Sequence, residues 1–169
     1  MTLSMYTQSV PAFLRGFTVL SSLFDKAEAF AEAKKISPDI LANARLAPDM
    51  LPLAGQVQRM SDTAKNAVGR LTGSAAPSFP DEEKTFADLR ERIDKTVAYL
   101  ETVDASALQG SEERTINLSV GKLKVDFTGQ AYLTTFALPN FYFHLTTAYA
   151  ILRHNGVDVG KRDFLGSFE

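Results

Sequence analysis

The chain contains no cysteine and has only two histidines, His144 and His154. Without cysteine it can form no disulfide, no thiolate nucleophile and no thiolate metal ligand. Two histidines also cannot supply the three imidazoles of a common zinc site within one chain. These absences exclude cysteine chemistry and any three-histidine metal centre.

Long hydrophobic runs and an excess of charge of one sign are also missing. No window holds about eighteen consecutive apolar residues, so no membrane-spanning helix is predicted. Eighteen Lys and Arg residues stand against twenty Asp and Glu residues, giving a net charge of −2, which offers no electrostatic reason for nucleic acid or an anionic membrane as partner. The start, MTLSMYTQSVPAF, lacks the basic residues and the continuous apolar segment of a signal peptide. We expect a cytoplasmic protein.

The composition that remains is typical of one globular domain. The 169 residues are 45% hydrophobic, which suffices for a buried core and argues against disorder. No internal repeat or low-complexity segment divides the chain. A single domain over residues 1–169 is therefore predicted.

Four segments carry apolar residues at helical spacing. The first covers residues 5–35, where Pro11 marks a kink or the effective start, and its stripe is Phe13, Phe17, Leu20, Phe24 and Ala27. The second follows Asp49, a good N-cap, has Pro52 in its first turn and ends at Gly73. Its stripe is Leu53, Val57, Met60, Ala64, Ala67 and Leu71.

The third helix is expected to open at Asp81, where acidic residues favour the positive end of the helix dipole. Its stripe is Phe86, Leu89, Ile93, Val97 and Leu100, and Asp88–Arg92 and Glu91–Lys95 are predicted ion pairs on its exposed side. The last helix is expected over residues 129–155, bent by Pro139 and stopped by Gly156, and the tail is expected to return onto the bundle through Phe164 and Leu165.

Between the third and last helices the apolar period changes from 3.6 to 2. Ile116, Leu118 and Val120 alternate with polar residues, as do Leu123, Val125 and Phe127, and Gly121-Lys122 between them suits a two-residue hairpin turn. An isolated hairpin is marginal, so it must lie against the helices. The predicted fold is all-α: an antiparallel four-helix bundle with a small β-hairpin between its third and fourth helices.

The last helix carries the candidate functional residues. Asn140 and His144 lie four residues apart and share one helical face, and Thr147 follows three residues later. Such a face could hold a metal or orient a substrate, and a kink at Pro139 would turn side chains toward a cavity. The alternative is that His144 is a core histidine bonded to a neighbour. Gln56, beside the apolar stripe of the second helix, is either a pocket residue or a helix-flank amide.

The strings PNFYFHLTTAYAILRHNGVDVGKRDFLG, LAPDMLPLAGQVQ and FPDEEKTFADL carry a family resemblance. Together they resemble a bacterial family known only as a domain of unknown function, within the DinB/YfiT-like four-helix bundles. Many of those bundles are metal-dependent, some are thiol-dependent transferases or hydrolases, and they are often homodimeric. The resemblance therefore implies a DinB-like bundle, a homodimer and a pocket at the place of the superfamily's metal.

In that superfamily one histidine on the second helix and a His-x-x-x-His pair on the fourth hold the metal. The resemblance places His144 on the last histidine, Asn140 on the first of the pair and, by a looser match, Gln56 on the second-helix histidine. Amides are poor ligands for zinc or nickel, so no metal is expected, and any ion present would have to bind at His144.

Three functions follow as hypotheses. The first is a binding module whose metal-free pocket, lined by Gln56, Asn140, His144 and Thr147, holds a small molecule. The second is a transferase or hydrolase that uses His144 as its catalytic residue, either as general base or as the anchor of a metal. The third is a structural or interaction protein. We also expect the side chains of Gln56, Asn140 and His144 to meet.

Overall fold

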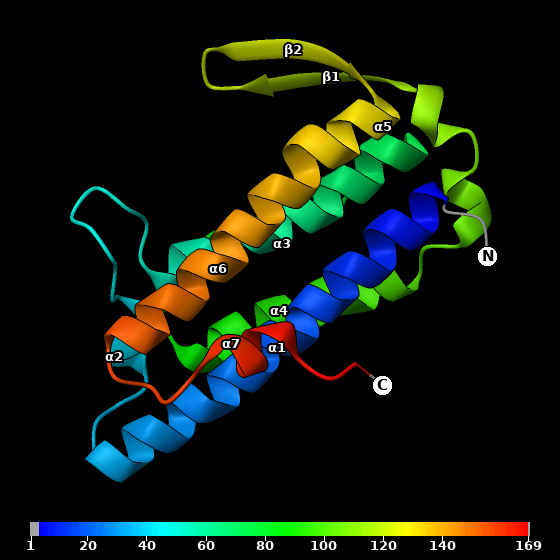
Figure 1. Ribbon diagram of the computed structural model, residues 1–169. Coiled ribbons are helices and arrows are strands. Elements are labelled where there is room, and N and C mark those ends of the chain that lie inside the picture. Colours follow the sequence, from blue (N-terminus) through cyan, green and yellow to red (C-terminus); the bar gives the residue numbers. More distant parts are fainter. Residues whose placement is uncertain (1–3, 169) are drawn as a thin grey trace.

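Four long helices form a bundle in the computed structural model, which describes residues 4–168. They are α1 (Met5–Lys34), α3 (Leu53–Thr72), α4 (Phe86–Glu101) and α6 (Leu138–His154), and Figure 1 shows them side by side. Short helices α2 (Asp39–Ala42) and α7 (Lys161–Leu165) and the 3-10 turns η1 (Ala105–Leu108) and η2 (Ser111–Glu113) lie in the connections. The mostly helical, DinB-like bundle predicted from the sequence is confirmed.

The long helices do not simply alternate in direction along the chain. Helices α3 and α6 are antiparallel, and so are α1 and α4, whereas α3 and α4 run the same way (Figure 1). The segment 73–85 therefore has to return along the length of the bundle. Arg92 of α4 holds it there by donating to the carbonyl oxygen of Pro80 and to the carboxylate of Glu83.

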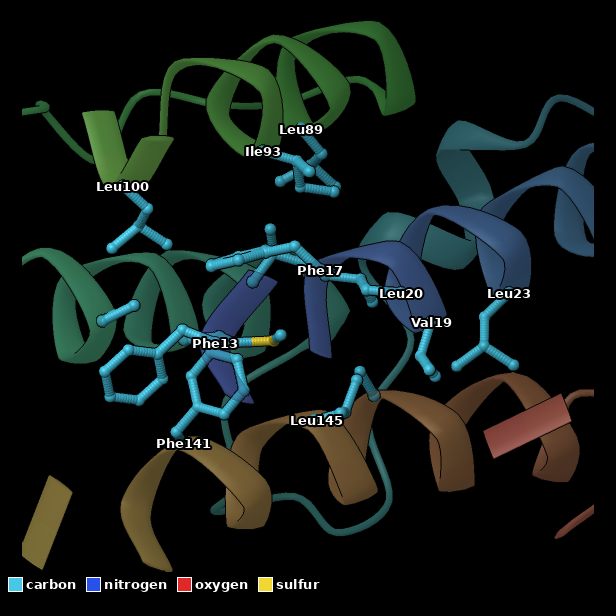
Figure 2. Close-up of a cluster of buried hydrophobic side chains, with 14 of the residues drawn as sticks. Phe13, Phe17, Val19, Leu20, Leu23, Leu89, Ile93, Leu100, Phe141 and Leu145 are labelled. Atoms are coloured by element: carbon cyan, nitrogen blue, oxygen red, sulfur yellow. The ribbon is translucent and has the colours of Figure 1, made fainter. Parts of the chain in front are cut away.

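The core lies between the facing apolar stripes. Figure 2 shows Phe13 and Phe17 of α1 pointing toward Phe141 of α6, and the ring centroids lie 4.9 Å and 5.5 Å from that of Phe141. A Cβ atom on Gly16 would come within 2.4 Å of the Phe141 ring, so the missing side chain is what allows this contact. The close packing of α1 on α6 depends on that glycine.

Two predicted helix starts are wrong. Helix α3 begins at Leu53 after Pro52, so Asp49 is not its N-cap. Helix α4 begins at Phe86, because Thr85 and Asp88 form a capping box there, and Asp81 instead pairs with Arg59 and Arg92. A carboxylate that is paired with two guanidinium groups is not available to cap a helix.

The predicted Asp88–Arg92 pair on an exposed face is also wrong. The side chain of Arg92 is only 1% exposed and binds Asp62, Asp81 and Glu83, while Asp88 caps its own helix. The Glu91–Lys95 pair forms as predicted, with 2.6 Å between nitrogen and oxygen. Helix α1 runs through Pro11, because the capping box of Ser4 and Thr7 fixes its start.

The hairpin consists of β1 (Thr115–Val120) and β2 (Leu123–Thr128), paired antiparallel with Val120 opposite Leu123. Gly121 opens the turn at φ +58°, as the glycine-first turn requires. Ile116 and Leu118 are buried, and Asn117 and Ser119 are exposed, so the alternation is confirmed there. The side chains of Val120 and Leu123 lie outside the described part.

The last long helix begins at α5 (Gly129–Tyr132), capped by Thr128, and continues through a π-helical turn, η3 (Leu133–Ala137), into α6. The N–H of Leu138 donates to the carbonyl of Leu133, five residues back. A wider, π-helical turn therefore lies directly before Pro139, at the place where the sequence predicted a bend. In the tail, Phe164 packs on Tyr149 as expected, but Leu165 stays 39% exposed.

Candidate functional site

The candidate site lies in the seam between α3 and α6. On α3, Gln56, Arg59 and Thr63 follow at intervals of three and four residues, which places them on one face. On α6, Asn140 and His144 share a face for the same reason. Because the two helices are antiparallel, Gln56 lies opposite His144 and Thr63 lies opposite Asn140.

Gln56 and His144 are bonded to each other inside the protein. The Nδ1 atom of His144 lies 2.8 Å from Oε1 of Gln56, and the residue is only 9% exposed. The Nε2 atom of Gln56 donates to the carbonyl oxygen of Leu51 at 2.9 Å. These two bonds join the connector before α3, α3 itself and α6.

The bond to Leu51 determines which nitrogen of His144 carries the proton. A carbonyl oxygen only accepts, so the amide nitrogen of Gln56 must face Leu51 and its oxygen must face His144. The Nδ1 atom therefore donates, and in the neutral ring Nε2 has a free lone pair. No described residue bonds to Nε2, and no buried polar side-chain atom of the described residues lacks a partner, so Nε2 is not completely shielded from solvent.

The charge state of His144 follows from its surroundings. Burial lowers its pKa from 6.5 to about 4, and the positive charge of Arg59 acts in the same direction. The ring is therefore neutral at pH 7. A base this weak accepts a proton poorly in a reaction at neutral pH, although its lone pair still accepts a hydrogen bond.

Asn140 lies one turn before His144 on α6 but forms no hydrogen bond with His144 or Gln56, although we expected the three side chains to meet. Its Nδ2 atom donates instead to the hydroxyl of Thr63 at 2.7 Å. The hydroxyl of Thr147 donates back to the carbonyl of Phe143 in its own helix, at 2.8 Å. Of the predicted site residues the structure thus bonds Gln56 to His144, places Asn140 one turn away, and leaves Thr147 beside the pair.

An apolar groove of about 520 Å³ lies on the outer side of α6, over Phe143 and Thr147, which are near neighbours of His144 on that helix. Its lining consists of Leu46, Met50, Tyr142, Phe143, Thr146, Thr147 and Ala150. Phe143 is 56% exposed, and its ring centroid lies 5.3 Å from that of His144. The ring of Phe143 thus connects the groove to the imidazole, which does not itself line the groove. The volume is within the size range of small-molecule sites.

Sequence reasoning missed Arg59, Thr63 and the connector residues of the groove. Arg59 and Thr63 lie three and seven residues after Gln56, and that spacing alone could have placed them on its face. Leu46 and Met50 belong to an irregular segment with no periodic pattern. The second histidine, His154, does not belong to the site, since it is exposed at the end of α6.

The residues that the family resemblance places at a metal site offer few metal ligands. His144 offers one imidazole nitrogen, while the oxygen of Gln56 already accepts from His144. The amide nitrogen of Asn140 is turned toward Thr63, and amide groups are weak ligands for zinc and nickel. Within residues 4–168, no three His, Cys, Asp or Glu side chains gather into a group that could hold a metal ion.

Comparisons with known proteins agree with this fold. A family described as "Domain of unknown function (DUF1993)" matches residues 5–165. A crystal structure of a DinB family member protein from Shewanella denitrificans is 45% identical, covers 97% of this chain and 93% of its own, and superposes with a TM-score of 0.91. No curated protein matches the chain. No helix in the described part is long and apolar enough to cross a membrane.

Proposed function

The chain belongs to the DUF1993 family, and from that membership and the site's geometry we propose that it binds a small organic molecule beside His144. The observation that carries the proposal is the His144–Gln56 bond, which leaves Nε2 free and neutral next to an apolar groove. Ligand sites commonly combine an apolar wall with a few fixed polar groups. The groove supplies the wall and His144 the polar group.

A pKa of about 4 for His144 supports binding over catalysis by general base. The transferase or hydrolase hypothesis requires either a stronger base or a metal, and the amides at positions 56 and 140 are unsuited to hold one. We therefore propose a metal-free site. Metal analysis of purified protein tests this, because stoichiometric zinc or nickel would contradict it.

Benzyl alcohol is a suitable first ligand to test binding, since it joins a ring to one hydroxyl. At millimolar concentration it should shift the ring signals of His144 in NMR spectra and raise the melting temperature, because a ligand bound only by the native state stabilises it. Thr146→Trp, which fills the groove from an exposed position, should abolish both effects. His154→Trp, at an exposed position outside the groove, is the matched control. Binding that survives in Thr146→Trp would place the site elsewhere.

We further propose that the protein forms a homodimer through helix faces, in which the second copy packs on the exposed residues at the rim of the groove and leaves room for the ligand inside. Leu46, Leu51, Tyr142 and Phe143 are all exposed there, and a face of this kind gains free energy when a second copy covers it. Light scattering should give twice the chain mass of 18.5 kDa. Phe143→Ser should shift the protein toward monomer, whereas Phe168→Ser, which removes an exposed ring in the tail, should not. A parent mass near 18.5 kDa would refute the dimer.

A further inference from the structure

Asn140 presents a second acceptor next to the one on His144. The hydroxyl of Thr63 donates its only proton to the carbonyl oxygen of Arg59, at 2.6 Å. Its oxygen can then only accept from Asn140, so the amide nitrogen of Asn140 must face Thr63. The Oδ1 atom of Asn140 is left without a partner among the described residues, and since no such buried atom is unsatisfied, it is open to solvent.

Two backbone carbonyls thus fix the polarity of the site. The carbonyl of Leu51 acts through Gln56 on His144, and the carbonyl of Arg59 acts through Thr63 on Asn140. Each pair of hydrogen bonds leaves one acceptor atom without a partner among the described residues, Nε2 on His144 and Oδ1 on Asn140. Since His144 and Asn140 are four residues apart on one helix, their side chains are neighbours. The protein therefore offers two hydrogen-bond acceptors at this site, and a ligand has to supply the two donors.

We propose that the ligand is an uncharged molecule with two hydrogen-bond donors, such as a primary amide, attached to an apolar group. The donors meet Nε2 of His144 and Oδ1 of Asn140, and the apolar group lies along Phe143 in the groove. An anion brings no donor to the two acceptor atoms, so it can form neither hydrogen bond. A cation is disfavoured because Arg59 lies near enough to His144 to lower its pKa. This inference rests on the proposed function and narrows it to one ligand class.

Benzamide and four analogues test each part of the inference. N,N-Dimethylbenzamide has no donors, benzoate is an anion, benzamidinium is a cation, and acetamide lacks the ring. Affinities are measured from the NMR shifts of the His144 ring, which His154→Leu assigns because the chain has two histidines. We expect benzamide to bind at least about tenfold more tightly than N,N-dimethylbenzamide, since losing even one hydrogen bond has about that effect. Benzamide should also bind more tightly than the other three analogues, which differ from it in charge or lack the ring.

Two variants at Asn140 separate recognition from folding. Asn140→Leu removes the acceptor and should weaken benzamide binding about tenfold. Asn140→Asp keeps an acceptor but adds a negative charge, so it should retain benzamide binding and improve that of benzamidinium. His154→Leu, on the same helix but exposed, should match the parent protein. Melting temperatures measured alongside show whether each variant is folded.

The outcomes distinguish this inference from the function on which it rests. If N,N-dimethylbenzamide or benzoate binds as tightly as benzamide, the ligand class is wrong while a small-molecule site beside His144 remains. If Asn140→Asp does not shift the preference toward benzamidinium, Asn140 does not contact the ligand and the two-acceptor assignment fails. If none of the five compounds moves the His144 signals, the proposed function and this inference both fail.

Discussion

The pH dependence of folding tests the environment of His144 directly. Its pKa falls from 6.5 in the unfolded chain to about 4 in the folded one, because burial and the charge of Arg59 disfavour the imidazolium. Each pKa unit corresponds to about 1.4 kcal/mol, so the full difference corresponds to about 3 kcal/mol. Since Nε2 is not completely shielded from solvent, which stabilises the charged ring in part, we expect about 2 kcal/mol.

The sign follows from proton binding. Between pH 6.5 and about pH 4 the unfolded chain binds a proton at residue 144 that the folded protein does not. The free energy of unfolding therefore rises with pH in this window. The contribution of His144 is fully present above pH 6.5 and is lost as the pH falls toward 4.

Urea unfolding of the parent protein and His144→Gln from neutral pH to about pH 4 measures the effect. Glutamine at position 144 does not bind a proton. The free energy of unfolding of the variant should therefore fall by about 2 kcal/mol less than that of the parent over this window. Carboxylates with lowered pKa, such as those of Asp88 and Asp163, also make both proteins less stable on acidification. Their effect is the same in the parent and the variant, so it cancels when the two are compared. Equal pH dependence in the parent and His144→Gln would refute the neutral, desolvated imidazole.

Two further substitutions test the packing that positions the site. Arg92→Met should lower the free energy of unfolding by about 3–5 kcal/mol, because it removes the buried guanidinium that pairs with Glu83, 11% exposed, and that also binds Asp62, Asp81 and the hydroxyl of Ser61. Arg90→Met, at a side chain 29% exposed on the same helix, should cost less than about 1 kcal/mol, and a similar loss in both would contradict the role assigned to Arg92. Gly16→Ala should destabilise the protein by about 1–3 kcal/mol, since its Cβ would overlap the Phe141 ring. Calorimetry checks this, and a gain in stability, as glycine-to-alanine usually gives in a helix, would show that the ring moves aside.

Much of the fold could be predicted because the apolar stripes and the hairpin alternation record which side chains face the core. The helix starts were harder to predict. A capping side chain is recognised by type alone, and Asp81 has the same type as a cap although its carboxylate serves two arginines. The burial of Arg92 was missed for a related reason. The spacing of Arg92 and Asp88 on one helix is the same whether the arginine is buried or forms an exposed ion pair.

The site was predictable only where regular helices determine it. Positions 56 and 144 lie on helices that face each other, so their meeting followed from helical faces and the family resemblance. The hydrogen-bond partner of Asn140 depends instead on how far α3 and α6 are shifted along each other. Residue spacing within one helix does not reveal this shift. Leu46 and Met50 enter the groove from a connector whose path is set by tertiary contacts such as the bond between Leu53 N–H and the carbonyl of Ala44.

The π-helical turn η3 has a consequence for the length of the chain. Gly129, Leu133, Ala137, Phe141 and Leu145 are all buried, at intervals of four residues. In an uninterrupted α-helix each such step rotates the side chain by about 40°, which would carry the row around the helix and out of the core. A π turn holds more residues per turn and slows that rotation, in the manner of a one-residue insertion. Deleting one residue between Leu133 and Ala137 should therefore yield an ordinary α-helix whose two ends keep their buried faces, whereas the same deletion within α6 would turn His144 away from Gln56.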